Sequence, residues 1–331
     1  MYITRASLIR VAKETAQKYA FTDSGVLAAY LTGSVRTETP FLGNATDIDI
    51  VFVHAGEPII HREIIPLTPE IHLDIVHNPR RFYDKPKELR VHPWLGPELY
   101  DPLPLYVTQH FFEFIQAGVR DRYHDPANIH MRSRHLAEDA RQVWKDLHPG
   151  QPHGPQHVLN YLRSISLVAN AVALLSGELL AERRFLLQFP ERARACNQPG
   201  LAAGPLNLLG ANRVDAAMLA DFLPEWEIAF LEAAGSPVVS RRIAAARLGY
   251  YKQAFEFILA GETPQAILWP LMLTWTQSVS VLPPAWDVRW RSACVVLGLD
   301  EASFGERIGE LDHFLDSVEA IQESLANSQG L

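Results

Sequence analysis

The sequence predicts a two-part protein, with a small α/β domain containing a mixed sheet at the N-terminus and an all-α helical bundle after it. Three observations support this fold class. Short runs rich in β-branched residues alternate with turns over the first 80 residues. A proline-rich stretch follows at 93–104, and beyond residue 110 the pattern is helical, with no convincing strand. We therefore expect an N-terminal domain over 1–125 and a helical domain over 126–331, with a linker-like stretch at 148–155.

The N-terminal domain is expected to open with an amphipathic helix at 4–19 and a strand at 26–32 that ends at Gly33-Ser34. Glycine at this point allows a sharp turn, and Ser34 is expected to cap a short helix over 35–40. The remaining predicted elements are a link at 41–46, strands at 47–53, 59–67 and 70–77, a helix at 79–90 that Pro86 weakens, and a loop at 93–104.

Two of the predicted strands carry paired polar residues. Asp47 and Asp49 flank Ile48, and because side chains alternate along a strand, both carboxylates are expected on one face. Neighbouring carboxylates repel each other, so such a pair persists most readily around a cation, and oxygen ligands suit Mg²⁺. On the later strand His72 and Asp74 share a face in the same way.

This order of Gly33-Ser34, Asp47-x-Asp49 and a later Asp74 resembles the polymerase-β-like nucleotidyltransferase superfamily over roughly the first 80 residues. The resemblance implies that the Gly-Ser turn holds the triphosphate of a nucleotide. It also implies that Asp47, Asp49 and Asp74 are catalytic and hold two Mg²⁺ ions. Arg36, just after the turn, is expected either to reach a phosphate or to face solvent.

Asp74 has two possible roles, because the third acid of the superfamily is a metal ligand in many members and a general base for the acceptor in others. Glu98 and Asp101 are candidate substrate-binding acids. Asp101 has the alternative of capping a turn before Pro102.

The second half is expected to be helical, and its region 161–188 resembles the helical domain of bacterial aminoglycoside adenylyltransferases. There, a helix arginine, a Gly-Glu turn and a following lysine face the nucleotide. Arg163 and Gly177-Glu178 match, but the lysine position falls at Glu182, a departure that weakens the substrate assignment. Arg183 or Arg184 can supply the missing charge, or they form a plain surface cluster; Glu178 is a further substrate candidate. The expected helices are 105–122, 126–147, 156–176, 178–189, 213–234, 238–260, 263–281 and 301–327.

Composition narrows the class of partner. The net charge of −8 argues against a nucleic-acid partner held by bulk electrostatics, although a local basic groove is compatible with it. The two cysteines are too few for a disulfide framework and suit a reducing cytoplasm. The N-terminal segment carries charges through its apolar pattern, so neither a signal peptide nor a membrane partner is expected.

Taken with these resemblances, the sequence predicts an enzyme that binds ATP and Mg²⁺ in a cleft between the two domains. It would transfer AMP to a hydroxyl of a small molecule, with an aminoglycoside-like antibiotic as the first candidate, and release pyrophosphate. One alternative is a nucleotidyltransferase that modifies a protein or tRNA, in the manner of a toxin or antitoxin component. The other is a catalytically inactive nucleotide-binding interaction module.

Overall fold

The chain divides into two compact units in a computed structural model, which describes residues 3–108, 110–147, 153–238 and 240–330. The first unit comprises Met1–Asp125 together with Ala246–Ala254, and the second comprises Pro126–Ala245 and Phe255–Leu331. The short segment 246–254 thus joins the first unit, which the predicted boundary does not anticipate. Of the predicted linker 148–155, residues 148–152 lie outside the described part of the chain.

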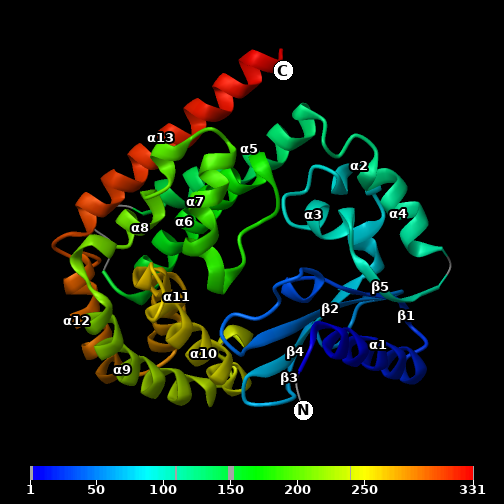
Figure 1. Ribbon diagram of the computed structural model, residues 1–331, viewed down its shortest axis with the longest axis horizontal. Coiled ribbons are helices and arrows are strands. Elements are labelled where there is room, and N and C mark those ends of the chain that lie inside the picture. Colours follow the sequence, from blue (N-terminus) through cyan, green and yellow to red (C-terminus); the bar gives the residue numbers. More distant parts are fainter. Residues whose placement is uncertain (1–2, 109, 148–152, 239, 331) are drawn as a thin grey trace. The chain divides into compact units, whose positions relative to one another are not determined.

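The first unit is built on a small mixed sheet of five strands in the order β3-β4-β2-β1-β5 (Figure 1). Strands β2 and β4 pair in parallel, and the other three pairings are antiparallel. The sheet confirms the coarse architecture expected of the N-terminal part. The strands are β1 Val26–Leu31, β2 Thr46–His54, β3 Arg62–Pro66, β4 Ile71–Pro79 and β5 Leu103–Val107.

The predicted loop at 93–104 is wrong, because this stretch contains helix α3 (Leu95–Tyr100) and the beginning of strand β5. Pro97 stands in the first turn of α3, where its missing N–H would have no helical partner in any case. Pro104 lies in β5, an edge strand of the sheet, where proline is tolerated. The predicted helix at 105–122 accordingly begins only at Phe111.

Two further corrections concern short helices of the first unit. The helix expected over 35–40 is a single 3-10 turn, η1 (Ser34–Arg36), because the backbone becomes extended at Thr37. The segment 79–90 is broken, as Pro86 suggested, since Pro86 opens a separate helix. The helical elements here are α1 Arg5–Thr22, η1, η2 Arg80–Tyr83, α2 Pro86–Leu89, α3 and α4 Phe111–Arg120.

The described part of the second unit is helical, as expected. The predicted helix at 178–189 begins only at Phe185, the one at 238–260 begins at Leu248, and helix α12 was not predicted. Helix α6 is long and apolar enough to cross a membrane by length and composition, yet 72% of its most apolar window is buried inside the protein. The main helices are α5 Pro126–Lys145, α6 Pro155–Ser176, α7 Phe185–Ala195, α8 Gly204–Leu208, α9 Ala216–Ala234, α11 Leu268–Val279, α12 Asp287–Leu297 and α13 Phe304–Gln329. Helix α10 (Leu248–Leu259) begins in the first unit and continues into the second from Phe255.

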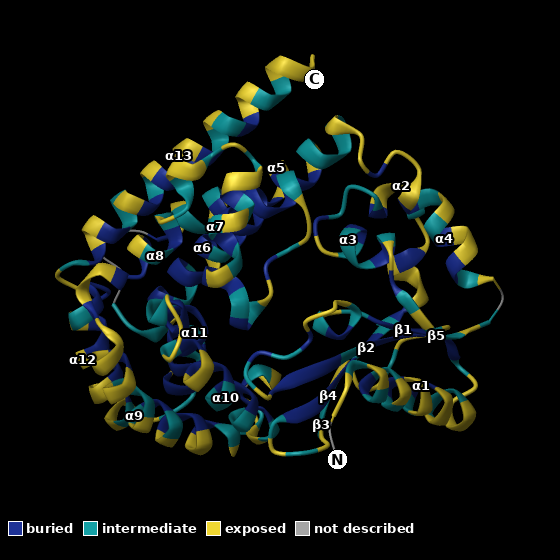
Figure 2. Ribbon diagram, viewed as in Figure 1, coloured by how far each residue is buried: buried dark blue, intermediate teal, exposed yellow. Residues whose placement is uncertain are grey.

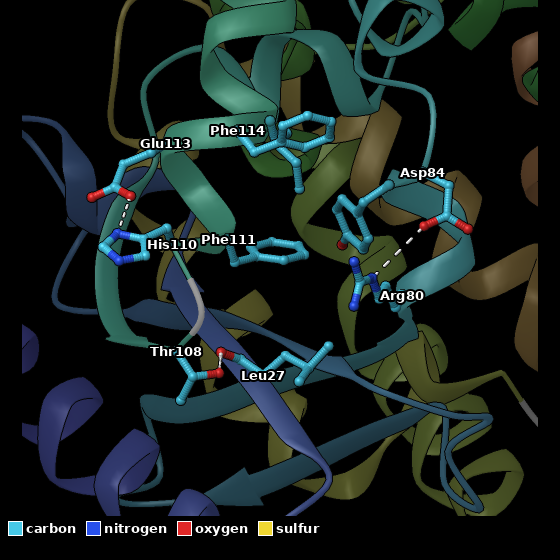
Figure 3. Close-up of a pocket in the computed structure, with 10 residues that line it drawn as sticks. Leu27, Arg80, Asp84, Thr108, His110, Phe111, Glu113 and Phe114 are labelled. Atoms are coloured by element: carbon cyan, nitrogen blue, oxygen red, sulfur yellow. Dashed lines mark hydrogen bonds and ion pairs between the residues drawn. The ribbon is translucent and has the colours of Figure 1, made fainter.

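The sheet is buried along its central strands, as the dark ribbon of β2 and β4 shows in Figure 2. One face packs against η2 and helices α2 to α4. A cavity of about 430 Å³ opens near this face, and Tyr83, Phe111 and Ile115 are among the residues that line it (Figure 3). None of Asp47, Asp49 and Asp74 lines this cavity.

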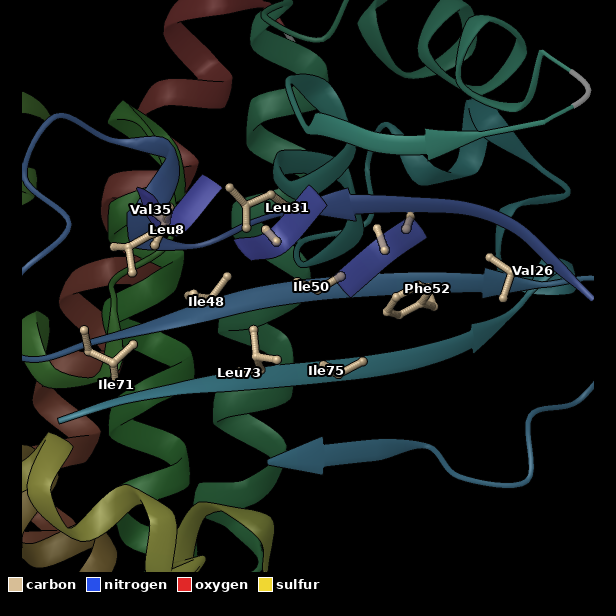
Figure 4. Close-up of a cluster of buried hydrophobic side chains, with 13 residues drawn as sticks. Leu8, Val26, Leu31, Val35, Ile48, Ile50, Phe52, Ile71, Leu73 and Ile75 are labelled. Atoms are coloured by element: carbon tan, nitrogen blue, oxygen red, sulfur yellow. The ribbon is translucent and has the colours of Figure 1, made fainter. Parts of the chain in front are cut away.

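The opposite face packs against α1 through a cluster that includes Leu8, Ala12 and Ala16. Ile48, Ile50 and Phe52 of β2 point into this cluster, as Figure 4 shows. Because side chains alternate along a strand, burying these three on the α1 side directs Asp47 and Asp49 to the other face.

Candidate functional site

The parallel pairing of β2 with β4 brings the predicted carboxylates together. Asp47 lies opposite His72, and Asp49 lies opposite Asp74. Residues directly opposite one another in a sheet project from the same face, so all four side chains share one face. The expectation that Asp47 and Asp49 point the same way is therefore confirmed.

Asp47, His72 and Asp74 lie close enough to share a metal ion. Each offers one ligand atom, and these atoms all lie within 4.8 Å of one another. All three residues are buried. Among the described residues, this group includes His72, which was not predicted as a ligand. It does not include Asp49, which was.

Asp49 instead lies against the Gly-Ser turn. Gly33 adopts φ +66°, and a Cβ atom at this position would lie 1.8 Å from the Asp49 Oδ2 atom. The Thr32 amide donates a 2.9 Å hydrogen bond to the Asp49 carbonyl, which ties the turn to β2. Burial raises the pKa of Asp49, as do the neighbouring charges of Asp47 and Asp74, while Arg247 and Arg62 oppose the shift.

Ser34 does not cap a helix, contrary to the prediction, because no side-chain capping bond forms at η1. Its hydroxyl lies 3.2 Å from the Thr46 hydroxyl at the start of β2. The Arg36 carbonyl accepts a 2.8 Å hydrogen bond from Arg5 of α1. These bonds attach both sides of the turn to the rest of the first unit.

Two guanidinium groups hold Asp74. Arg62 of β3 binds it with a bidentate pair of hydrogen bonds, 2.8 Å to Oδ1 and 2.6 Å to Oδ2. Arg247 donates from Nη2 to Asp74 Oδ2 at 2.6 Å. Bidentate arginine–carboxylate pairs combine strong charge-assisted hydrogen bonds with a fixed orientation. Asp74 is therefore the most tightly held carboxylate of the group.

Arg247 and Tyr250 belong to the segment 246–254, and the sequence reasoning missed both. The Tyr250 hydroxyl donates a 2.8 Å hydrogen bond to Asp47 Oδ2. Arg247 Nε lies 3.0 Å from His72 Nε2. Nothing local in the sequence marks these residues, because Arg247 and Asp74 stand 173 positions apart along the chain.

The two candidate substrate acids of the first unit have different surroundings. Glu98 accepts a 2.5 Å hydrogen bond from Tyr30, whose hydroxyl lies 3.0 Å from that of Tyr83. Burial raises the pKa of Glu98, although the Tyr30 hydrogen bond and the charge of Arg36 act the other way. Asp101 is exposed and pairs with Arg120 at 3.1 Å.

The candidate residues of the helical half all belong to the second unit, whereas the carboxylates belong to the first. Arg163 on α6 is exposed, Arg183 is buried, and Arg184 is half-buried in the 3-10 turn before α7. Glu178 is exposed just after α6 ends. Glu182, at the position where the resemblance expects a lysine, accepts a 2.5 Å hydrogen bond from Arg242.

No model of a known protein family matches the sequence, and no curated protein matches it either.

Proposed function

We propose that the protein is a Mg²⁺-dependent nucleotidyltransferase with a polymerase-β-like catalytic domain, which transfers AMP from ATP to a hydroxyl of a small molecule. The observation that carries this proposal is the contact between Gly33 and the Asp49 carboxylate. A glycine turn lets a phosphate approach the backbone closely, and here that turn lies against a face bearing three aspartates. Phosphate binding and cation binding would thereby be joined on one face of the sheet.

The residues present fit a hard divalent cation. The Asp47 and Asp74 carboxylates supply oxygen ligands, and Asp49 stands on the same sheet face. His72 contributes a nitrogen at the same point, a ligand type that suits transition-metal ions better than Mg²⁺. When bound, two Mg²⁺ ions would neutralise the triphosphate and lower the pKa of the acceptor hydroxyl.

The protein groups of the Gly-Ser turn would bind and orient the nucleotide. The backbone N–H groups of Gly33 and Ser34, with the Ser34 hydroxyl, would hold the β- and γ-phosphates. The acceptor hydroxyl would give its proton to solvent water as its oxygen attacks the α-phosphorus, and the bond from that phosphorus to pyrophosphate would break as the new ester forms. In such a transfer the main task of the protein is positioning and charge stabilisation.

The contacts of Asp74 support a role as a metal ligand. Both of its oxygens already accept guanidinium N–H groups, so neither is placed to take a proton from an acceptor hydroxyl. Asp74→Asn should therefore weaken Mg²⁺-dependent ATP binding together with turnover, as calorimetry and a pyrophosphate-release assay would measure. If Asp74 is instead the general base, ATP binding survives while turnover falls about 10²–10⁴-fold.

The acceptor is proposed to be a cationic, hydroxyl-bearing small molecule of the aminoglycoside type. The net charge of −8 favours such an acceptor over an anionic one, because opposite charges steer association. Within the first unit, Glu98 and Asp101 remain the candidates for contacts with the acceptor.

The test combines ATP binding with product analysis. ATP should raise the melting temperature in Mg²⁺ and much less in EDTA, and Asp49→Asn should remove this effect while the protein stays folded. The matched control is Asp139→Asn, an exposed aspartate of α5. Mass spectrometry should detect an adenylylated product when an aminoglycoside panel is incubated with protein, ATP and Mg²⁺. AMP transfer to a protein or RNA from a cell extract, with no product in the panel, would favour the alternative acceptor class.

A further inference from the structure

The segment 246–254 is held firmly in the first unit. Its neighbours on both sides belong to the second unit. A Cβ atom at Gly249 would lie 2.0 Å from the Pro69 carbonyl oxygen in the turn before β4, so only glycine allows this close approach. Tyr250 is buried, and its ring lies edge-on to His72 at 4.9 Å between centroids. The segment therefore presents Arg247 to the carboxylates from a fixed backbone.

The Arg247 guanidinium contacts every member of the group that can share a metal ion. Its Nη2 atom lies 2.6 Å from Asp74 Oδ2 and 3.5 Å from Asp47 Oδ2, and its Nε atom lies 3.0 Å from His72 Nε2. Arg247 itself is only 5% exposed. Because Arg247 reaches ligand atoms of all three residues, it stands where a shared metal ion would stand, and the two exclude one another by volume and by the repulsion of like charges.

We propose that Arg247 is the placeholder for the cation in the nucleotide-free protein and becomes a ligand of the nucleotide phosphates once metal is bound. This inference rests on the proposed function. A buried guanidinium that leaves its carboxylates needs another anionic partner, because an unpaired buried charge is strongly unfavourable. Phosphate is the other group that accepts the guanidinium fork in bidentate geometry.

Arg62 allows a metal ion to replace Arg247 while Asp74 keeps a positively charged partner. It binds both oxygens of Asp74 from β3, and its side chain is 43% exposed. When Arg247 moves away, Asp74 keeps this bidentate partner and its orientation. The two arginines thus have different duties: Arg62 positions Asp74, and Arg247 alternates between the carboxylates and the nucleotide.

Arg247→Met tests both parts of the proposal, the competition with metal and the binding of phosphate, because it keeps the side-chain bulk and removes the charge. Without its competitor, Mn²⁺ should bind more tightly, roughly 10-fold to 100-fold, as the loss of the free Mn²⁺ signal in electron paramagnetic resonance would show. ATP binding at saturating Mg²⁺, measured by calorimetry, should weaken by a similar factor. In EDTA the variant should melt below the wild type, and Mn²⁺ should restore its melting temperature.

Two further variants serve as controls. Arg247→Lys keeps the charge and loses the fork, so Mn²⁺ affinity should stay near the wild-type value while ATP binding weakens. Arg242→Met removes an arginine that pairs with Glu182 in the second unit, and it should change neither measurement.

In Arg247→Met the expected changes in Mn²⁺ affinity and in ATP affinity have opposite signs, and this distinguishes the proposal from a structural role of Arg247. If Arg247→Met weakens both Mn²⁺ and ATP binding, Arg247 merely orders the carboxylates and the inference is overturned. If neither affinity changes, it is overturned as well. If the wild type binds Mg²⁺ and ATP, but Arg247→Met does not bind Mn²⁺ more tightly and ATP more weakly, the proposed function survives and this inference alone fails. If neither wild type nor variant binds Mn²⁺ or ATP, both fail.

Discussion

Gly33 is the residue on which the geometry of the candidate site depends most directly. Its backbone, at φ +66° and ψ −160°, lies in a region that is essentially restricted to glycine. The absent side chain also leaves the space that the Asp49 carboxylate fills. Two independent physical reasons, backbone conformation and contact, therefore require glycine at this one position.

Gly33→Ala should destabilise the protein by about 1–3 kcal/mol from the backbone conformation alone, with a further cost as Asp49 is displaced. Chemical denaturation would measure the loss, and the Mg²⁺-dependent effect of ATP on melting should disappear. Gly56→Ala is the matched control, because an added Cβ there meets no atom within 4 Å. A Gly33→Ala protein with wild-type stability and ATP binding would contradict the assigned role of the turn.

At the scale of single elements, the sequence predicts the strands that carry the site but does not predict which strands pair with each other. Alternation of β-branched residues located β2 and β4 and put Asp47 with Asp49, and His72 with Asp74, on shared faces. Parallel pairing, which makes the four side chains adjacent, follows from topology and leaves no local mark. Proline misled the prediction at 93–104, since its effect depends on position within a helix or sheet and not on its frequency.

The segment that carries Arg247 shows why the sequence predicts the carboxylates but not the arginine that binds them. Arg241, Arg242 and Arg247 look alike in the sequence, yet only Arg247 reaches Asp74 in the described structure. Which arginine does so depends on how the segment folds back on the turn at Pro69. Long-range packing of this kind is decided by the whole first unit.

Gly249→Ala tests the docking of this segment. A Cβ at 2.0 Å from the Pro69 carbonyl forces the backbone apart, and overpacking of this kind typically costs about 1–3 kcal/mol. We expect a lower melting temperature and a tighter Mn²⁺ site, since Arg247 is drawn away with the segment. Gly200→Ala, where an added Cβ meets open space, should leave both unchanged. Unaltered stability in Gly249→Ala would show that the contact is not tight in solution.

Helix α6 carries a second testable feature at its first turn. Both ring nitrogens of His157 are buried and make no hydrogen bond within the described part of the chain, and the ring packs near Phe304. Burial lowers the pKa of His157. An unfolded histidine, with a pKa of about 6.5, then binds a proton more strongly than the folded one, so folding is favoured above that pH and loses this contribution as pH falls.

The free energy of unfolding should therefore decrease between about pH 7 and pH 5, by at most about 1.4 kcal/mol per pH unit from this group. His157→Phe should flatten the slope, as urea denaturation at a series of pH values would measure. His313→Phe, at an exposed position of α13, should keep the wild-type slope. An identical slope in wild type and His157→Phe would exclude His157 as its source.

At the scale of the whole molecule, the first unit is discontinuous in sequence. Residues 1–125 require 246–254 to complete the polar face, and the chain on both sides of that segment belongs to the second unit. Unfolding of the second unit would leave unfolded chain at both ends of the segment, although its contacts with Pro69 and His72 lie within the first unit. The two units are thereby coupled through the chain itself.

This coupling predicts a single cooperative transition for the wild type in differential scanning calorimetry. Gly249→Ala, which loosens the segment, should separate the trace into two transitions, since multi-domain proteins unfold in steps when their parts are independent. Two resolved transitions in the wild type would show that residues 246–254 do not link the units energetically.

Because the first unit is discontinuous in sequence, the ribosome synthesises its two parts at different times. All five strands have been synthesised by residue 107, yet Arg247 and Tyr250 follow only near residue 254. At about 5–20 residues per second, the ribosome needs roughly 6–26 s to travel from residue 125 to residue 254. Throughout that interval, of the two arginines that bind Asp74, only Arg62 has been synthesised. The acidic face, although its strands are encoded early, is thus the last part of its own unit to be completed.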